Sequence, residues 1–185
     1  MTNSKKIILD LCGGTGAWSR PYKEAGYDVR LITLPENNVL TYEPPENVYG
    51  ILAAPPCTDF ASSGARWFAE KDKDGRTLES MGVLIAVLEI IARSQPVFWA
   101  LENPIGRIRR WMHTPTMTFD PCDFGDPYTK RTHLWGRFNI PGKTPVEPTE
   151  GSKMWRCYGG KSERTKMMRS VTPPGFANAF FEANQ

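Results

Sequence analysis

A cysteine ends the short apolar run ILAAPPC, directly after two prolines. The prolines restrict the backbone, so the turn that they form sets the direction in which Cys57 points. Most free cysteines are small buried hydrophobes, and Cys57 taken alone fits that description. The alternative is a nucleophile, because a thiolate at the open edge of a sheet can attack an electrophilic carbon.

An acid and two basic residues stand at similar positions further along the chain. Glu102 ends the apolar run WALE and is followed by Asn103. In apolar surroundings the pKa of a carboxyl group rises, which keeps a proton available for general acid catalysis. A helix cap or an ion pair is the simpler interpretation of Glu102, and a solvated charged edge is the simpler interpretation of Lys130 and Arg131, which precede THLWG.

The stretch LDLCGGTGAW, residues 9 to 18, is rich in glycine. Glycines between a strand and a helix let a ligand come close to backbone amides, and Asp10 at the end of the strand can accept hydrogen bonds from a cofactor. A turn of this kind also occurs as a purely structural connection. Its place in the first unit of the chain favours a cofactor site.

These residues need strands and helices to position them. Apolar runs with β-branched residues predict strands in KKIILDL, YDVRLIT, VYGILAA, PVFWALENP and THLWGRFNI. Helices are predicted at about 16–25, at 77–93 and in the terminal stretch GFANAFFEA, which Pro173 and Pro174 start. The alternation predicts an α/β fold with a doubly wound, mostly parallel sheet, in which ligands bind beyond the carboxyl ends of the strands.

The composition indicates a single globular domain over residues 1–185. The chain is 40% apolar and carries a net charge of +3, which permits a polyanionic partner without demanding one. Its four cysteines form no C-x-x-C pair, which disfavours zinc and disulfides and favours reduced thiols in a cytoplasmic protein. Charges and a proline interrupt the longest apolar run, so we expect no membrane span.

Taken in order, the glycine-rich turn, the Pro-Pro-Cys turn, the Glu-Asn-Pro stretch and the basic pair resemble the motifs of the cytosine-5 DNA methyltransferase family. The resemblance runs from Ile8 to about Gly136 and resumes at RSVTPPGFANAFFEA. It is closest to a compact, phage-like member of that family. The resemblance implies a Rossmann-like fold that binds S-adenosylmethionine, DNA as the substrate, and chemistry that needs no metal.

The resemblance also implies roles for individual residues. Cys57 matches the thiolate that adds to C6 of cytosine, Glu102 the protonated carboxyl at N3, and Arg131 the arginine that holds the base at O2. The segment 58–76 matches a mobile loop that closes over a base flipped out of the duplex. The residues that match the cofactor site are Asp10, Gly14, Gly16, Trp18, Glu36, Asn38, Pro55, Pro56, Ser170 and Val171.

A short basic and aromatic insertion at about 141–169 stands where DNA-reading members of the family carry a target-recognition domain. Basic residues interleaved with aromatics suit phosphate contact and base stacking, whereas a solvated loop is the simpler alternative. We predict a loop here. The candidate nucleic-acid-binding residues are Lys130, Lys153, Trp155, Arg156, Tyr158, Lys161 and Arg164.

Several departures from the family pattern leave other functions open. Glu36 comes a few residues late for the acid that holds the cofactor ribose, and Asn38 replaces an aspartate. The glutamine and the first arginine expected before Arg131 are missing. These changes are consistent with a non-catalytic nucleic-acid- or protein-binding module that keeps the fold. The missing recognition domain also leaves RNA or a free nucleotide as the substrate of the enzyme.

Overall fold

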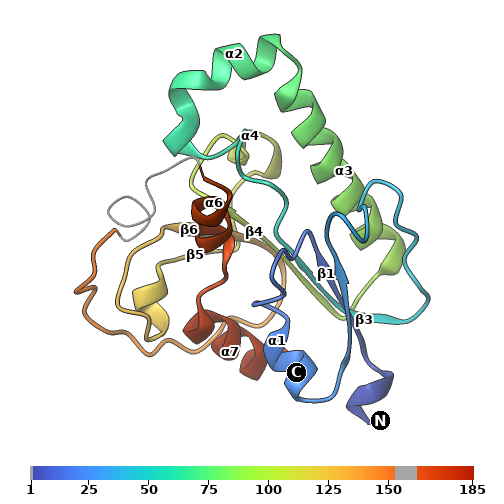
Figure 1. The fold of residues 1–185 in the computed structure, drawn as a ribbon. Helices are drawn as coiled ribbons and strands as arrows, with labels where there is room; N and C mark the ends of the chain where they lie inside the picture. The colour runs from blue at the N-terminus through green and yellow to red at the C-terminus, as the bar shows by residue number, and fades with distance from the viewer. Residues whose placement is uncertain (1, 153–161) are drawn as a thin grey trace.

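The computed structural model describes residues 2–152 and 162–185 and contains a six-stranded sheet (Figure 1). The strand order is β2-β1-β3-β4-β6-β5. The first four strands in this order are parallel, and β6 runs antiparallel to both β4 and β5. The predicted α/β fold with a mostly parallel sheet is therefore confirmed. The strands are β1 (Ile7–Leu11), β2 (Asp28–Ile32), β3 (Val48–Ala53), β4 (Phe98–Pro104), β5 (Met117–Phe119) and β6 (Thr132–Arg137).

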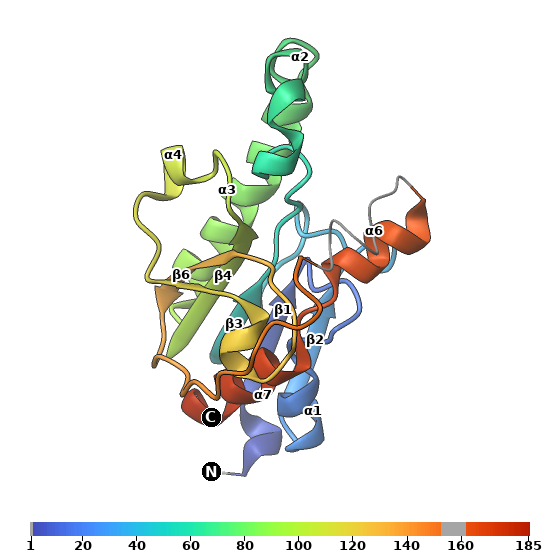
Figure 2. The ribbon, with the colours of Figure 1, turned by 90° about the vertical axis from the view of Figure 1, so that its left-hand side faces the viewer.

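Helices pack on both faces of the sheet, as Figure 2 shows from the side. Leu9 and Ile51 lie in one core cluster with residues of α3 (Arg76–Ser94). Their neighbours Ile8 and Leu52 lie in a second cluster with residues of α1 (Arg20–Glu24) and α7 (Pro174–Ala183). Because both faces are covered, the strands are apolar at consecutive positions rather than at alternate ones.

The longest described helix, α3, agrees closely with the helix predicted at 77–93. It begins after Gly75 and ends at Gln95, which adopts the left-handed conformation that often stops a helix. Leu84, Val87 and Ile90 form its buried stripe. No helix within the described part of the chain is both long enough and apolar enough to cross a membrane.

Two predicted segments differ from the structure. The helix expected at about 16–25 is confined to α1, because Gly14 and Gly16 have positive φ angles of 54° and 68° that an α-helix cannot contain. The insertion predicted as a loop contains a helix, α6 (Glu163–Ser170), whose first turn is capped by the side chain of Ser162. The shorter elements are η1 (Asn3–Lys5), η2 (Ser62–Trp67), α2 (Phe68–Lys73), α4 (Arg109–Met112) and η3 (Pro121–Phe124).

Candidate active site

The chain reverses its winding direction between β1 and β3. From β1 it continues to β2 on one side, whereas β3 lies on the other side of β1. The loops that leave the carboxyl ends of β1 and β3 diverge at such a point and leave a crevice for a ligand. The first of these loops contains the glycine-rich stretch, and the second contains Pro55, Pro56 and Cys57.

Asp10 is fully buried at the carboxyl end of β1. Its Oδ2 accepts a hydrogen bond from the Ser19 hydroxyl at 2.5 Å, and its Oδ1 has no partner among the described residues. Burial raises the pKa of Asp10 to about 6, against the opposing effect of the Ser19 hydrogen bond. A Cβ on Gly13 would lie 2.3 Å from the Asp10 carboxyl, so only glycine fits there.

The glycine-rich loop approaches the segment that precedes α7. A Cβ built on Gly14 would lie 4.0 Å from the Ser170 Oγ. Ser170 is exposed at the end of α6, and Val171 is half-buried beside it. The structure thus brings Asp10, Gly14, Gly16 and the Ser170 segment to one place. The Ser170 hydroxyl donates to the Met167 carbonyl at 2.8 Å and can still accept a hydrogen bond. This oxygen, the left-handed glycines and the Asp10 Oδ1 fit the amino and hydroxyl groups of S-adenosylmethionine.

The other predicted cofactor residues lie in different surroundings. Trp18 is only 2% exposed and packs against Phe176 and Phe180 of α7 at ring-centroid distances of 5.7 and 5.4 Å. Its ring is therefore part of the core rather than of an open surface. Glu36 and Asn38 are exposed in the loop after β2, where the Asn38 Oδ1 accepts a hydrogen bond from the backbone amide of Leu40 at 3.0 Å.

Cys57 is held by its neighbours in the turn after β3. The Asn103 side chain, fully buried in β4, donates a hydrogen bond from Nδ2 to the Pro55 carbonyl at 3.0 Å. The Cys57 carbonyl accepts hydrogen bonds from the backbone amides of Phe60 and Ala61 at 3.0 and 2.8 Å. Pro55 is buried, Pro56 is exposed, and the thiol is half-buried. The Glu-Asn-Pro stretch thereby fixes the turn that carries the cysteine.

Glu102 lies one strand away from the cysteine turn and lines a small crevice with Lys130, Thr132 and Ser170. Burial raises the pKa of Glu102, and the positive charge of Lys130 opposes that rise. Burial also raises the pKa of Cys57, Glu102 raises it further, and Lys130 and Arg169 lower it. Burial therefore makes Glu102 harder to ionise, and the charges of Lys130 and Arg169 partly offset the cost of forming a thiolate at Cys57.

Cys12 is a poor alternative to Cys57 as a nucleophile. Burial and the nearby Asp10 raise the pKa of Cys12 to about 11, which keeps its thiol protonated at neutral pH. Cys12, Cys57 and Cys122 are free thiols. Within residues 2–152 and 162–185, no group of three histidine, cysteine or acidic side chains is placed to hold a metal ion.

Lys130, rather than Arg131, faces Glu102. Thr132 opposes Pro104 in the β4–β6 ladder, and successive side chains at this end of β6 alternate between the two faces. Lys130 and Thr132 line the crevice with Glu102. Arg131 is 60% exposed in its side chain and pairs with Asp120, with 2.9 Å between Nη1 and Oδ2. In this conformation Arg131 is therefore not placed to make the predicted contact with a base.

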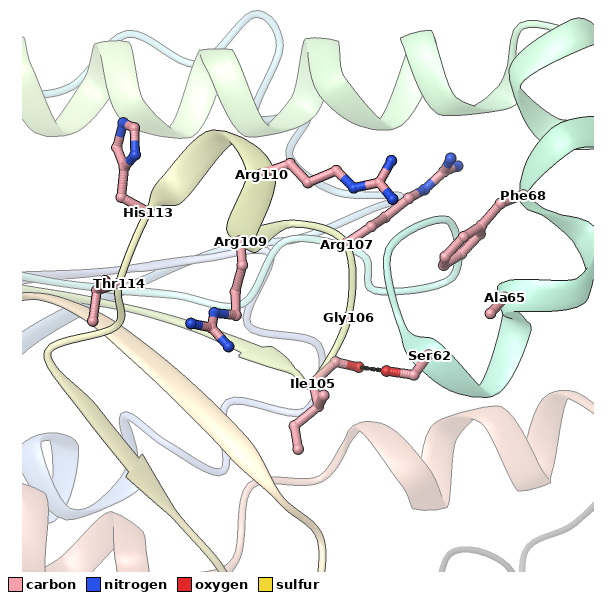
Figure 3. A pocket seen from close by; sticks show the side chains of 10 residues that line it. All are labelled: Ser62, Ala65, Phe68, Ile105, Gly106, Arg107, Arg109, Arg110, His113 and Thr114. Atoms are coloured by element: carbon pink, nitrogen blue, oxygen red, sulfur yellow. Dashed lines mark hydrogen bonds between the residues drawn. The ribbon is translucent and has the colours of Figure 1, made fainter.

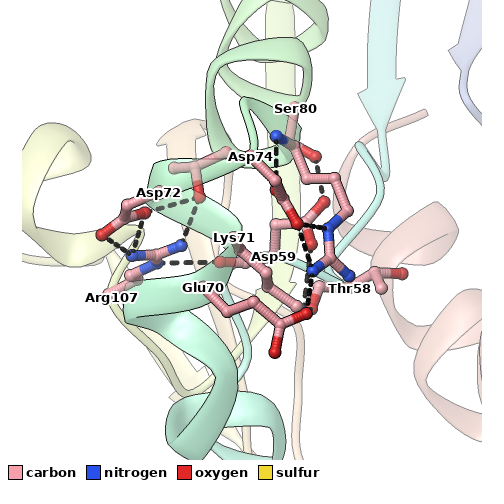
Figure 4. Close-up of polar contacts among 10 residues, drawn as sticks. Thr58, Asp59, Glu70, Lys71, Asp72, Asp74, Ser80 and Arg107 are labelled. Carbon is pink, nitrogen blue, oxygen red and sulfur yellow. Dashed lines mark hydrogen bonds and ion pairs between the residues drawn. The ribbon is translucent and has the colours of Figure 1, made fainter.

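The segment after Cys57 forms η2 and α2 and is held by polar contacts, rather than being an open loop (Figure 4). The buried Lys71 Nζ lies 3.0 Å from the Asp59 Oδ1 and donates to the Thr58 carbonyl at 2.5 Å. The Ser80 hydroxyl of α3 donates to the Asp59 Oδ2 at 2.6 Å. This network ties the chain that follows the cysteine to both α2 and α3.

The predicted nucleic-acid-binding residues are only partly described. Lys130 is half-buried, and its Nζ donates to the Arg169 carbonyl at 3.1 Å. Arg164 is exposed on α6. Five further candidates lie outside the described residues: Lys153, Trp155, Arg156, Tyr158 and Lys161.

Sequence reasoning missed three contributions to the site. Asn103 follows Glu102 in the sequence, but only the packing of β4 against β3 shows that its side chain holds the Pro55 turn. Ser19 gives no sequence signal as the partner of Asp10. The place of Lys130 beside Glu102 could have been found from strand alternation, counted from the apolar residues of THLWG.

Comparison with known proteins supports the fold. No protein-family model and no curated protein matches the chain. A similar solved structure is described as a proposed DNA modification methyltransferase encoded within a prophage of E. coli, with a TM-score of 0.51 and 15% sequence identity. The fold is methyltransferase-like. The match covers 85% of this chain and 56% of that protein, so this chain spans little more than half of its length.

Proposed function

We propose that this protein transfers a methyl group from S-adenosylmethionine to C5 of cytosine in DNA, with Cys57 as the nucleophile. The observation that carries the proposal is the hydrogen bond from Asn103 to the Pro55 carbonyl. It locks the cysteine turn to the strand that carries Glu102. A thiol and a carboxyl with a raised pKa thereby share one edge of the sheet with the Asp10 loop.

In the proposed reaction the Cys57 thiolate forms a bond to C6 of the base. The electron pair of the C5–C6 double bond then becomes available at C5, and Glu102 donates a hydrogen bond or proton at N3 to disperse the charge. Bound S-adenosylmethionine would supply an electrophilic methyl group to C5 and leave as S-adenosylhomocysteine. Loss of the C5 proton to water then restores the double bond as the sulfur–C6 bond breaks and Cys57 leaves as a thiolate, and any proton that N3 took from Glu102 returns to it.

Residues of the chain suit the remaining tasks. Three features suit binding of the cofactor: the Asp10 Oδ1, which has no partner among the described residues, the positive φ angles of Gly14 and Gly16, and the Ser170 hydroxyl. Lys130 suits the role predicted for Arg131, because it is the cation whose charge acts on both Cys57 and Glu102. A thiolate beside a cation forms more readily than an isolated one.

The test is covalent trapping on 5-fluorocytosine. In this base fluorine replaces the C5 proton whose loss releases the enzyme, so the adduct persists. The protein is incubated with S-adenosylmethionine and with the fluorinated base in duplex DNA, in RNA or as a nucleotide. We expect an adduct with DNA that survives denaturation, and mass spectrometry should locate it on the peptide that contains Cys57. An adduct with RNA or nucleotide alone would move the substrate to that class.

Cys57→Ser is the key variant, and Cys122→Ser is its matched control. Cys57→Ser should form no adduct and still bind S-adenosylmethionine in calorimetry, whereas Cys122→Ser should do both. Cofactor binding without an adduct on any of the three substrates would refute the catalytic proposal. That result would favour the non-catalytic binding module.

A further inference from the structure

A basic groove lies beside the cysteine turn and outside the residues predicted to bind nucleic acid. It has a volume of about 630 Å³ and lies between the segment 62–68 and the segment 105–114 (Figure 3). These segments are the chains that leave the Cys57 turn and the Glu102–Asn103 stretch, respectively. The groove is therefore built from the continuations of the two strands that carry the proposed catalytic residues.

The floor of the groove is fixed by backbone contacts. The amide and the hydroxyl of Ser62 both donate to the Ile105 carbonyl, at 2.8 and 2.6 Å. The Arg107 amide donates to the Phe60 carbonyl at 2.8 Å. A Cβ on Gly106 would lie 1.9 Å from that same carbonyl, so the two segments are in direct contact. Such a floor presents its side chains at set positions.

The charge of the groove is positive, and the carboxylate of Asp72, which also feels the charge of Arg110, compensates part of it. Arg107 is buried and contacts both carboxylate oxygens of Asp72 at 2.7 and 2.9 Å, with its guanidinium over the Phe68 ring. Arg109 and Arg110 are exposed and have no ion-pair partner in the part of the chain that the structure describes. Among the residues that the structure describes, the groove lining includes His113 and no acidic residue.

We propose that this groove binds the phosphodiester backbone of the nucleic acid through Arg109 and Arg110. Guanidinium groups match phosphate oxygens in geometry and stay charged at every physiological pH. Arg109 and Arg110 project in different directions from α4, which suits successive phosphates better than one small anion (Figure 3). A strand held here would lie next to the Cys57 turn, so the inference deepens the proposed function and rests on it for the identity of the substrate.

The test compares two double variants that each remove two exposed positive charges. Arg109→Ala/Arg110→Ala acts on the groove, and Arg20→Ala/Lys23→Ala acts on the distant helix α1. Binding of labelled duplex DNA, with single-stranded RNA as a second arm, is measured by fluorescence anisotropy over a range of salt concentrations. The groove variant should bind about tenfold more weakly at low salt, and its slope of log K against log salt should fall by about 1–2.

Further measurements make the test decisive. Arg109→Lys/Arg110→Lys should restore most of the slope, because lysine keeps the charge, and far-UV circular dichroism checks that each variant is folded. An unchanged slope in the groove variant, an equal loss in the α1 variant, or no binding of either polymer by the unmodified protein would overturn the inference. Adduct formation on 5-fluorocytosine is measured separately. An adduct without an arginine effect rejects the groove alone, and an arginine effect without an adduct rejects the catalytic proposal alone.

Discussion

Lys130 and Arg131 are neighbours in the chain, yet they act in different places. Lys130 lines the crevice of Glu102, and Arg131 pairs with Asp120 on the other side of the ladder. The cause is the two-residue period of an extended chain, which sends adjacent side chains to opposite faces. The residue type that a family motif prefers is therefore less informative here than the face on which it lies.

This difference predicts how the Cys57 thiol titrates. Lys130 lowers the pKa of Cys57, so Lys130→Met should raise that pKa and slow alkylation of Cys57 by iodoacetamide near pH 8. Mass spectrometry of the Cys57 peptide over a pH series measures the change. Arg131→Met is the control and should shift the profile less. A larger shift in the Arg131 variant would return the role to Arg131.

Two segments far apart in sequence meet just after β3 and β4. Gly106, just after β4, forms a β-bridge with Ala61, and a Cβ there would lie 1.9 Å from the Phe60 carbonyl. Backbone atoms cannot move aside as a flexible side chain can. The close approach therefore depends on the absence of a side chain at this one position.

Gly106→Ala should destabilise the protein by about 1–3 kcal/mol through this steric clash. Gly82→Ala is the matched control, because Gly82 lies within α3 with no atom near its missing Cβ. That change should raise stability by about 0.5–1 kcal/mol, since alanine favours a helix. Denaturant unfolding compares the two. Equal effects of the same sign would contradict the proposed contact.

At the scale of the whole molecule, α1 and α7 cover one face of the sheet and pack with Ile8 of β1 (Figure 2). Tyr22, Phe176 and Phe180 are fully buried there, and Trp18 packs among them. Asp10 lies on the same face as Ile8 and has no exposed surface. Folding therefore removes this carboxyl group from water, and its ionisation is linked to global stability.

The raised pKa of Asp10 predicts that the stability of the folded protein falls as the pH rises. Its pKa is about 6 in the folded state against 3.8 in the unfolded state, so the folded state keeps the proton to higher pH. The contribution of Asp10 to the free energy of unfolding is fully present below pH 3.8 and is lost as the pH rises through about 6. The stability of the unmodified protein relative to Asp10→Asn should fall by about 2 kcal/mol between pH 4 and pH 7.

Unfolding in urea at several pH values measures this difference. Asp28→Asn is the control, because Asp28 is partly exposed and pairs with Arg30 on β2, so its replacement should not reproduce the trend. A difference between the unmodified protein and Asp10→Asn that stays constant with pH would show that Asp10 titrates normally in the folded state.

The sequence by itself determined the elements whose signals are local. Apolar runs with β-branched residues located β1, β2, β3, β4 and β6, and helical spacing located α3 and α7. It also placed Cys57 and Glu102 at strand ends, because their positions follow from the runs that precede them. Strand and helix patterns are properties of neighbouring residues, so they can be read without knowing the fold.

Only the tertiary structure decided how these elements meet. Insertion of β6 between β4 and β5, the bond from Asn103 to Pro55 and the place of Lys130 beside Glu102 all depend on pairings between distant segments. The same holds for the burial of Trp18 and for the groove of Arg109 and Arg110. Such pairings are set by the packing of the whole chain, and no local stretch of sequence specifies them.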